Sequence, residues 1–243
     1  MVRNRTPTVL RVKNKTQLTP NMLRITFNGE GLLNFPSGQN GAHIKLVIPN
    51  GNDRPKVRTY TVRDFDAETK ELTVDFALHQ PAGPATSWAI HSQEGYEVGM
   101  VGPGPKKLVT DAAGWYLFAA DMSAMPAAIA SIEELPEDAE GEVFFEITDE
   151  KDKQEFDKPD RLKVHWLVHS QPHTQSDQQL EAIQAIDIPP SPNVFVAGEL
   201  GAIKKIKSYL LKTLEITSRN LYISSYWKIG ANEEEHKQAK AMG

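Results

Sequence analysis

The chain has 243 residues, 40% of them hydrophobic, and a formal net charge of −5. This is enough for two modest domains, and the negative charge without a basic stripe disfavours a nucleic-acid partner. The sequence contains no cysteine, which excludes disulfides, thiolate nucleophiles and iron–sulfur clusters carried by this polypeptide.

No window approaches 18 uninterrupted apolar residues, and the charged N-terminus has no apolar stretch behind it. We therefore expect a soluble cytoplasmic protein that neither spans a membrane nor carries a secretory signal.

The first half of the sequence alternates apolar and polar residues in short runs, as half-buried strands do. Turns rich in Gly, Pro and Asn separate these runs, which predicts a small antiparallel β-barrel. A short helix from Gly83 to His91 interrupts the pattern. The predicted strands are residues 8–13, 22–27, 43–48, 58–63, 71–78 and 96–101.

In the second half of the sequence the spacing of apolar residues changes. Residues 115–120 form a continuous apolar run, suited to a strand buried on both faces. Alternating strands and helices predict an α/β domain with a parallel sheet and crossover helices. The strands are expected at 115–120, 142–148, 163–168, 193–197 and 220–227, and the helices at 125–135, 177–186 and 203–214.

The remaining segments are a linker between the two predicted domains, a charged stretch and the C-terminal tail. We place a linker near residues 108–114 and the domains at 1–110 and 111–243. The highly charged stretch 148–161 is expected to be a solvated loop or helix end. The tail from residue 233 is expected to be a polar helix or a disordered end.

Arg58, Tyr60 and Thr61 form the most informative pattern in the first half. Because side chains alternate along a strand, Arg58 and Tyr60 should point the same way. A flavin dinucleotide needs a cation for its pyrophosphate, a flat ring against its isoalloxazine and a small donor near N5. An ordinary strand is the alternative, because Tyr and Thr favour sheets.

A second segment, Gly83-Pro-Ala-Thr86-Ser87, opens the short helix. Its backbone N–H groups suit an anion, and its hydroxyls suit helix capping. Both interpretations use the same donors, so they are compatible. Together with Arg58 and Tyr60, this segment predicts a flavoprotein.

Other patterns argue against competing chemistry. The stretch from Gly102 to Pro105 lacks GxGxxG and GK[ST], so we interpret it as a turn that closes the barrel. His165 and His169 lie four apart, which in a helix would suit a metal pair. The β-rich context favours a strand instead, and no carboxylate or cysteine completes the set, so no metal site is predicted.

The turn from Ala120 to Pro126 follows the first strand of the second domain. A strand-to-helix turn at the carboxyl edge of a parallel sheet is where a nucleotide docks. Gly198 ends a later strand at this edge and would let a nicotinamide approach closely.

These segments together resemble the siderophore-interacting proteins, a branch of the ferredoxin-NADP reductase superfamily that reduces iron(III) held in siderophores. The resemblance runs in order from about residue 5 to about residue 230. Its narrower signals are Trp88-Ala89, Ala197-Gly198-Glu199 and the closing Tyr226-Trp227-x-x-Gly230. The matching segments are residues 43–46, 58–63, 74–79, 83–89, 101–104, 120–127, 196–199 and 226–230.

The resemblance implies an FAD-binding β-barrel followed by a nucleotide-binding-like domain. It places Arg58 on the FAD pyrophosphate, Tyr60 on the flavin ring and Thr61 by N5. Arg63, expected on the same face, is a second phosphate or adenine contact. The remaining expected cofactor contacts are Asp75, His79, Ala85, Thr86 and Ser87.

The resemblance also implies an electron donor in the second domain, either NADPH or NADH, with reduced ferredoxin as an alternative. The usual glycine-rich turn is absent, and Asp121 stands in it, so we predict modest nicotinamide affinity. The expected donor-site residues are Asp121, Ser123, Ala197, Gly198 and Glu199.

The implied substrate is a ferric siderophore, often anionic, held by basic residues. The candidates are Lys45, Lys106 and Lys228, and the alternative for each is a solvated surface charge. The predicted function is FAD-dependent reduction of ferric to ferrous iron, because a flavin accepts two electrons and releases them singly. The alternatives are a reductase with another acceptor and a non-enzymatic binding module.

Overall fold

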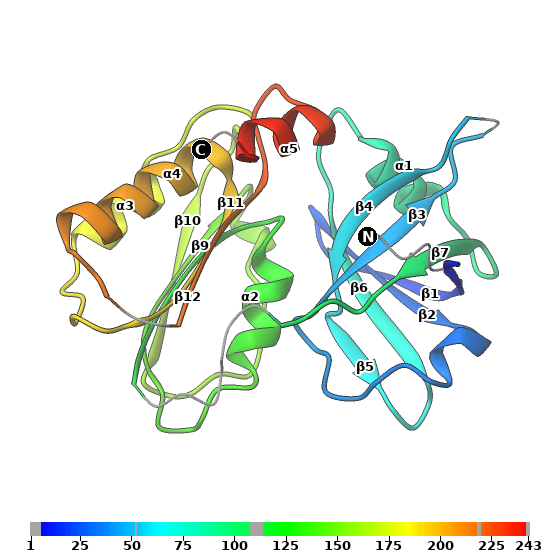
Figure 1. Ribbon diagram of the computed structural model, residues 1–243, viewed down its shortest axis with the longest axis horizontal. Coiled ribbons are helices and arrows are strands. Elements are labelled where there is room, and N and C mark those ends of the chain that lie inside the picture. Colours follow the sequence, from blue (N-terminus) through cyan, green and yellow to red (C-terminus); the bar gives the residue numbers. More distant parts are fainter. Residues whose placement is uncertain (1–5, 52, 107–113, 218–219, 242–243) are drawn as a thin grey trace. The chain divides into compact units, whose positions relative to one another are not determined.

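The computed structural model describes residues 6–51, 53–106, 114–217 and 220–241. The chain divides into two compact units, residues 1–107 and 108–243 (Figure 1). Of the linker region predicted at 108–114, only Gly114 is among the described residues. Each unit is described here by itself.

The first unit is an antiparallel seven-stranded sheet in the order β4-β3-β7-β1-β2-β6-β5. Its buried side chains form one core against which α1 packs, as the barrel prediction required. The strands are β1 (Thr8–Thr19), β2 (Met22–Asn28), β3 (His43–Ile48), β4 (Lys56–Thr61), β5 (Asp64–Asp66), β6 (Glu71–Ala77) and β7 (Glu97–Val101). The helices are η1 (Glu30–Leu32) and α1 (Pro84–His91).

Two predicted strand ends in this unit were wrong. The expected end of β1 at residue 13 lies at a bulge between Val12 and Asn14, after which pairing with β2 resumes. The bulge breaks the alternation on which the prediction depended. The strand predicted at 58–63 ends at Thr61, and the short strand β5 begins at Asp64.

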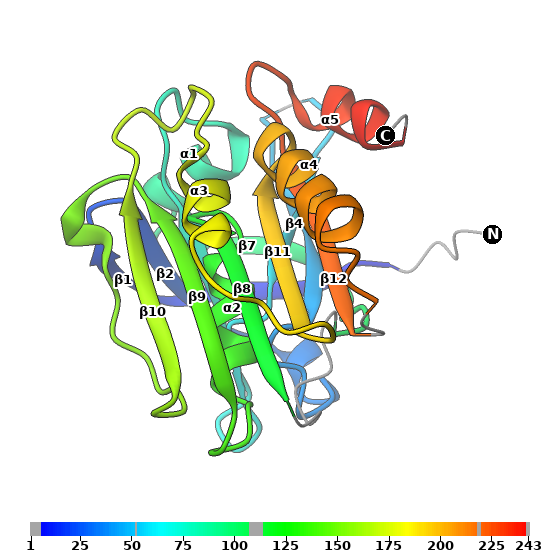
Figure 2. The ribbon, with the colours of Figure 1, turned by 90° about the vertical axis from the view of Figure 1, so that its left-hand side faces the viewer.

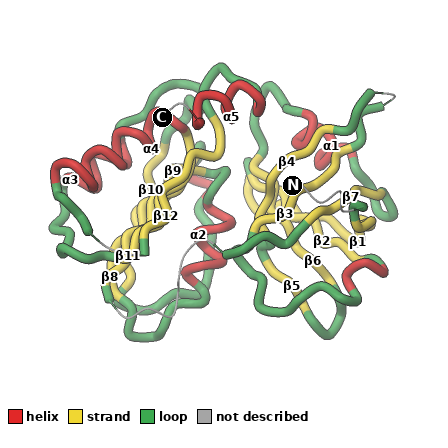
Figure 3. The backbone as a smooth tube through the Cα atoms, viewed as in Figure 1, coloured by secondary structure: helices red, strands yellow, loops and turns green. Residues whose placement is uncertain are grey.

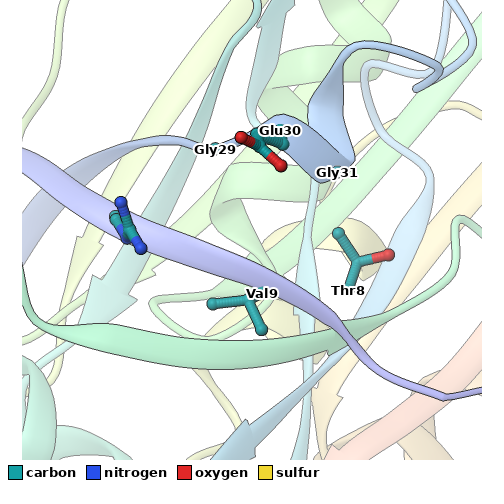
Figure 4. Close-up of a pocket in the computed structure, with 6 residues that line it drawn as sticks. Thr8, Val9, Gly29, Glu30 and Gly31 are labelled. Atoms are coloured by element: carbon teal, nitrogen blue, oxygen red, sulfur yellow. The ribbon is translucent and has the colours of Figure 1, made fainter.

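A shallow depression of about 350 Å³ lies where the start of β1 passes the segment Gly29–Gly31 (Figure 4). A Cβ atom on Gly31 would lie 2.0 Å from Cγ2 of Thr8, so the threonine occupies the space that a larger residue would need. None of the predicted site residues lines this depression.

The second unit is a parallel five-stranded sheet in the order β10-β9-β8-β11-β12. Helices α3 and α4 cover one face and α2 covers the other (Figure 2). This confirms the predicted α/β class. The strands are β8 (Trp115–Asp121), β9 (Glu140–Ile147), β10 (Leu162–Val168), β11 (Asn193–Glu199) and β12 (Leu221–Trp227). The helices are α2 (Met125–Ile132), η2 (Glu150–Asp152), α3 (Gln178–Gln184), α4 (Leu200–Ser208), η3 (Tyr209–Thr213) and α5 (Glu233–Ala241).

The helical segments of this unit, drawn in red in Figure 3, depart from prediction at α4 and in the charged stretch. Helix α4 begins three residues earlier than predicted, because Glu199 caps it, and it passes into a π-helical turn at Tyr209. The charged stretch expected to be solvated includes η2, in which Asp152 is fully buried. The polar tail forms the helix α5, which is one of the two outcomes predicted for it. Within the described residues, no helix has the length and apolar run needed to cross a bilayer.

Candidate functional site

Arg58 and Tyr60 lie on β4, an edge strand of the first unit. Tyr60 pairs in register with Ile44, and Arg58 with Leu46, both of which belong to the core. Cross-strand partners share a face, so Arg58 and Tyr60 point to the core side of the sheet together, as predicted. The ring of Tyr60 packs on Phe76 with centroids 4.4 Å apart.

The segment that opens α1 supplies backbone donors. The N-cap residue is Gly83, which has no side chain to cap the helix, and Pro84 follows it in the first turn. A Cβ atom on Gly83 would lie 3.6 Å from Cε1 of His79, so that imidazole lies beside the helix start. Helix α1 has contacts with β2, β3, β4 and β6, so it packs against the strand that carries Arg58 and Tyr60.

The hydroxyls of this helix differ in exposure. Thr86, the first choice for a pyrophosphate contact, is buried with only 4% of its surface exposed, and Ala85 is also buried. Ser87 is partly exposed. The structure therefore gives Ser87 the more accessible hydroxyl of the two.

Asp75 lies at the centre of a charged group that the sequence indicated only in part. It is 5% exposed, and both of its carboxylate oxygens accept hydrogen bonds from Arg24, at 2.7 and 2.8 Å. Nε of Arg63 lies 3.8 Å from the same carboxylate. Asp75 therefore holds two guanidiniums, and the group keeps a net positive charge.

Arg63 was predicted to continue the strand of Arg58 and Tyr60, and this was wrong, because it follows the end of β4 at Thr61. Its position is instead set by Asp75 on β6. Arg24 was missed, although it is the one cation of β2 and pairs in register with Asp75.

The predicted substrate lysines lie in different surroundings. Lys45 is exposed and pairs in register with Thr59, so it lies on the opposite face of the sheet from Arg58 and Tyr60. Thr61 pairs with His43 and shares the face of Lys45. Thr61, expected in the flavin site, and Lys45, expected in the substrate site, therefore lie on the same side of the β3–β4 hairpin.

His43 was also missed by the sequence analysis. The amide N–H of Gly104 donates to its carbonyl oxygen at 2.8 Å. A Cβ atom on Gly104 would lie 2.0 Å from the imidazole Cε1. The turn after β7 thus packs directly on His43 at the start of β3, and partly buried Lys106 follows this turn.

In the second unit, the predicted donor-site residues gather at the carboxyl edge of the sheet. Asp121 ends β8, Ala197 to Glu199 end β11, and Ser123 lies in the turn before α2. The strand order reverses between β8 and β11, which is the position where open α/β sheets bind nucleotides.

The carboxylate of Asp121 accepts hydrogen bonds from several groups at this edge. Oδ1 accepts hydrogen bonds from Ser123 N at 2.9 Å, from Ser123 Oγ at 2.5 Å and from Ala124 N at 3.3 Å. Oδ2 accepts from Trp227 Nε1 at 2.7 Å. Burial raises the pKa of Asp121 above its ordinary value, and the hydrogen bonds from Ser123 and Trp227 partly oppose that rise.

Gly198 permits the contact between Asp121 and Trp227. Its φ is +152°, and a Cβ atom there would lie 2.6 Å from Oδ2 of Asp121. The carboxylate of Asp121 takes the space beside the α-carbon of Gly198. That Gly198 lets a nicotinamide approach closely stays a prediction. Trp227 was treated only as part of a motif, and no sequence pattern revealed its hydrogen bond across β11.

Glu199 and Glu146 add two more carboxylates. Oε2 of Glu199 accepts from Gly201 N at 2.5 Å and Ala202 N at 3.1 Å, and Oε1 accepts from Ile229 N at 3.1 Å. Glu146 lies in register with Asp121 and accepts from Ser176 Oγ at 2.5 Å. Burial raises the pKa of Glu146, and the charges of Asp121 and Glu199 add to that rise.

Lys228 is exposed after β12 and lines a depression of about 420 Å³ at the start of α4. Lys204 of α4 lines the same depression, so two cations border it. The remaining lining residues are Gln175, Glu199, Leu200, Gly201, Ile229 and Ala239.

The two histidines considered for a metal lie in and just after a strand, as predicted. Nε2 of His165, on β10, lies 2.6 Å from Glu142, and Nε2 of His169 lies 3.2 Å from the carbonyl oxygen of Thr174. Among the described residues, no group of three or more His, Cys, Asp or Glu side chains is arranged to hold a metal ion.

Comparison with known families matches both units. Residues 113–230 match the family described as Siderophore-interacting protein. Residues 11–55 and 49–107 match the family described as Siderophore-interacting FAD-binding domain.

Individual relatives agree with these matches. The chain is 33% identical to the ferric vibriobactin reductase ViuB of Vibrio cholerae over 96% of this chain and 94% of that protein. It is 31% identical to the uncharacterised protein Rv2895c of Mycobacterium tuberculosis over 92% of this chain and 90% of that one.

The fold has solved counterparts. The siderophore-interacting protein SipS from Aeromonas hydrophila matches with a TM-score of 0.88 and 29% identity, over 98% of this chain and 97% of that one. A ferredoxin-NADP⁺ reductase from Plasmodium falciparum, in complex with 2′P-AMP, shares the fold at 12% identity with a TM-score of 0.64, over 89% of this chain and 96% of that one.

Proposed function

Because this chain belongs to the siderophore-interacting protein family, we propose that it reduces ferric iron held in a siderophore to ferrous iron, with electrons passing through FAD. The relative from Vibrio cholerae is named a ferric vibriobactin reductase, and a further relative from Acinetobacter baumannii is named a ferric acinetobactin reductase. A flavin-dependent ferric-siderophore reductase is the activity that these relationships support.

The observation that carries the proposal is the pairing of Arg58 and Tyr60 on one face of β4 with a helix start capped by a glycine. These residues fit an FAD molecule. The guanidinium of Arg58 and the N–H groups at the start of α1 would hold the pyrophosphate, and Tyr60 would support the flavin ring. Asp75 would keep Arg63 in place as a further cation.

FAD, when bound, accepts a pair of electrons and releases them one at a time, which matches a hydride donor to ferric iron. The chain's own residues therefore need to bind, orient and shield, without acting as acid, base or nucleophile. We assign FAD binding to residues 1–110 and donor binding to residues 111–243. Thr61 and His79 complete the proposed FAD set, with Ala85, Thr86 and Ser87.

The proposed donor is NADPH or NADH, bound at the carboxyl edge of β8 and β11, with reduced ferredoxin as the alternative. The strand order reverses at this edge, which favours a nucleotide. The proposed substrate residues are Lys45, Lys106 and Lys228, of which Lys45 and Lys228 are exposed. We place the reaction in the cytoplasm, where the released ferrous iron would be used.

The function is tested by measuring ferrous iron with a chromogenic ferrous chelator. The FAD-loaded protein is mixed anaerobically with a ferric siderophore and, in separate reactions, with NADH, NADPH or reduced ferredoxin. We expect one donor to support catalytic formation of ferrous iron, and none when FAD has been stripped. Oxidation of the donors by quinones or free flavin, with no reduction of any ferric siderophore, would instead support a reductase with another acceptor.

A further inference from the structure

We propose that Asp121 sets a low affinity for the donor dinucleotide, because its carboxylate occupies the backbone groups on which the donor's pyrophosphate would bind. This inference rests on the proposed donor role of the carboxyl edge of the second unit. On this proposal, Asp121 is the residue that makes the carboxyl edge bind pyrophosphate ligands weakly.

The turn between β8 and α2 presents two backbone N–H groups, those of Ser123 and Ala124, ahead of the helix. Such groups, next to a helix start at the point where the strand order reverses, form the usual cradle for a dinucleotide pyrophosphate. Here Ser123 N donates to Oδ1 of Asp121 at 2.9 Å, and Ala124 N is shared between Oδ1 at 3.3 Å and the backbone carbonyl oxygen of Asp121 at 3.0 Å. The chain's own carboxylate thus takes the place of an external anion.

The carboxylate is also fixed from the other side of the sheet edge. Oδ2 accepts the indole N–H of Trp227 at 2.7 Å, and Gly198 makes room for this contact because it lacks a Cβ atom. A pyrophosphate that binds to Ser123 N has to displace Oδ1 of Asp121, whose carboxylate Trp227 also holds through Oδ2. The intramolecular anion therefore competes with the donor at an effective concentration that no dilution lowers.

The neighbouring positions reinforce this effect. Glu199 caps α4 in the same way, through Gly201 N and Ala202 N, and Glu146 lies beside Asp121 in the sheet. Among the described residues, none of these three carboxylates forms an ion pair with a lysine or arginine, and the basic side chain that acts on Glu146 is His169. A pyrophosphate would bring its negative charges towards three carboxylates.

The proposal makes a specific prediction about ligands. Removing the charge of Asp121 should tighten every ligand that carries a pyrophosphate by a similar factor. That factor should not depend on the 2′-phosphate that separates NADPH from NADH. Freeing the Ser123 N–H for a charge-assisted contact is expected to change the dissociation constant about tenfold. Adenosine has no phosphate, so its affinity should not change.

The experiment is a calorimetric titration of the oxidised, FAD-loaded protein with ADP, NADP⁺, NAD⁺ and adenosine. The variants are Asp121→Asn, which removes the charge but keeps an oxygen that accepts from Ser123 N, and Asp121→Ala, which removes both the charge and the acceptor. Asp66→Asn is the matched control, because Asp66 accepts from the amides of Glu68 and Thr69 in an equivalent turn of the first unit. We expect tighter binding of the three pyrophosphate ligands only in the Asp121 variants.

Unchanged or weaker binding in folded Asp121 variants with full FAD content would overturn the proposal, because Asp121 would then contact the donor or be irrelevant to it. If both variants fail to fold, Trp227→Phe decides the question. This change releases Oδ2 but keeps the charge, and should tighten ADP about two- to threefold. No tightening there would also overturn the proposal.

The titrations use oxidised protein without siderophore, so they do not depend on the identity of the electron acceptor. Failure of the proposed function would appear separately, as an absence of ferrous iron when chemically reduced wild-type protein meets a ferric siderophore.

Discussion

The two units use the same structural device, the backbone N–H groups at a helix start, in opposite ways. In the first unit α1 begins at Gly83, which has no side chain to occupy these groups. In the second unit the turn before α2 and the start of α4 donate to the carboxylates of Asp121 and Glu199. No side chain caps the start of α1, whereas the turn before α2 already contains an internal anion.

This difference suits the two ligands that we propose. A resident cofactor has to stay bound through many reaction cycles, so its phosphate contacts should be open and cationic. An electron donor has to leave after each transfer, and tight binding of its common phosphate part would slow that exchange. The arrangement of charges therefore matches a tightly held FAD and a weakly held donor.

The largest expected effect comes from Arg58→Ala in the first unit. Loss of a charge-assisted contact to the FAD pyrophosphate should weaken FAD binding by roughly 1.5–3 kcal/mol, which is a factor of about 10 to 150. The measurement is the dissociation constant for FAD, followed by flavin fluorescence. Arg54→Ala, an exposed arginine ahead of the same strand, is the control and should bind FAD normally. Stoichiometric FAD retained by Arg58→Ala after dilution would count against this assignment.

A smaller loss is expected from Gly198→Ala in the second unit. The new Cβ atom would lie 2.6 Å from Oδ2 of Asp121 at a backbone φ of +152°. We expect the free energy of unfolding to fall by about 1–3 kcal/mol, measured by denaturant titration.

The control for this change is Gly38→Ala. Gly38 also has a positive φ, of +67°, but a Cβ atom there would meet nothing within 4 Å. An equal loss in both variants would show that backbone strain alone is responsible and that the contact between Asp121 and Trp227 is not.

Lys45→Ala should affect the iron substrate and leave FAD content intact. An exposed lysine that attracts an anionic ferric chelate contributes about 0.2–1 kcal/mol, so KM should rise up to about fivefold at low ionic strength. The rise should shrink as salt is added, because salt screens the attraction. Lys56→Ala, an exposed lysine on β4, serves as the control. A KM that does not change at low ionic strength would remove Lys45 from the substrate site.

The smallest expected effect is the pH dependence of the second unit. Burial raises the folded-state pKa of Glu146 above its ordinary value of 4.5, so the folded protein binds this proton more tightly than the unfolded chain. Glu146 therefore lowers stability above its folded-state pKa, and the loss is recovered as the pH falls towards 4.5.

We test this sign with Glu146→Gln, whose amide oxygen still accepts from Ser176. The variant should be more stable than the wild type at pH values above the folded-state pKa, and the difference should shrink on acidification. The measurement is the urea midpoint across that range. A variant that is less stable than the wild type at neutral pH would show that Glu146 is held in its ionised form.

The sequence predicted the element types and fold class well, because alternation in β2 and the apolar run of β8 follow directly from which faces are buried. It also predicted that Arg58 and Tyr60 share a face, because that depends only on the pleat of one strand. Boundaries were lost where a bulge in β1 or the cap at Glu199 changed the local pattern.

Contacts between residues far apart in the sequence could not be predicted from it. The hydrogen bond from Trp227 to Asp121 joins residues 106 positions apart, and that from Arg24 to Asp75 joins residues 51 apart. Asp121 was predicted near a dinucleotide on the basis of its turn. That its carboxylate already occupies the turn depends on side-chain geometry, which no spacing of residues reveals.

The central claim, electron transfer from FAD to siderophore iron, is tested most directly by a single-turnover reaction without any donor. The FAD-loaded protein is reduced chemically, freed of excess reductant and mixed anaerobically with a ferric siderophore. We predict that the oxidised flavin absorption returns as about two ferrous ions form per FAD, because each ferric ion accepts one electron of the pair. Flavin that stays reduced in the presence of ferric siderophores, while it is reoxidised by a quinone, would contradict the account.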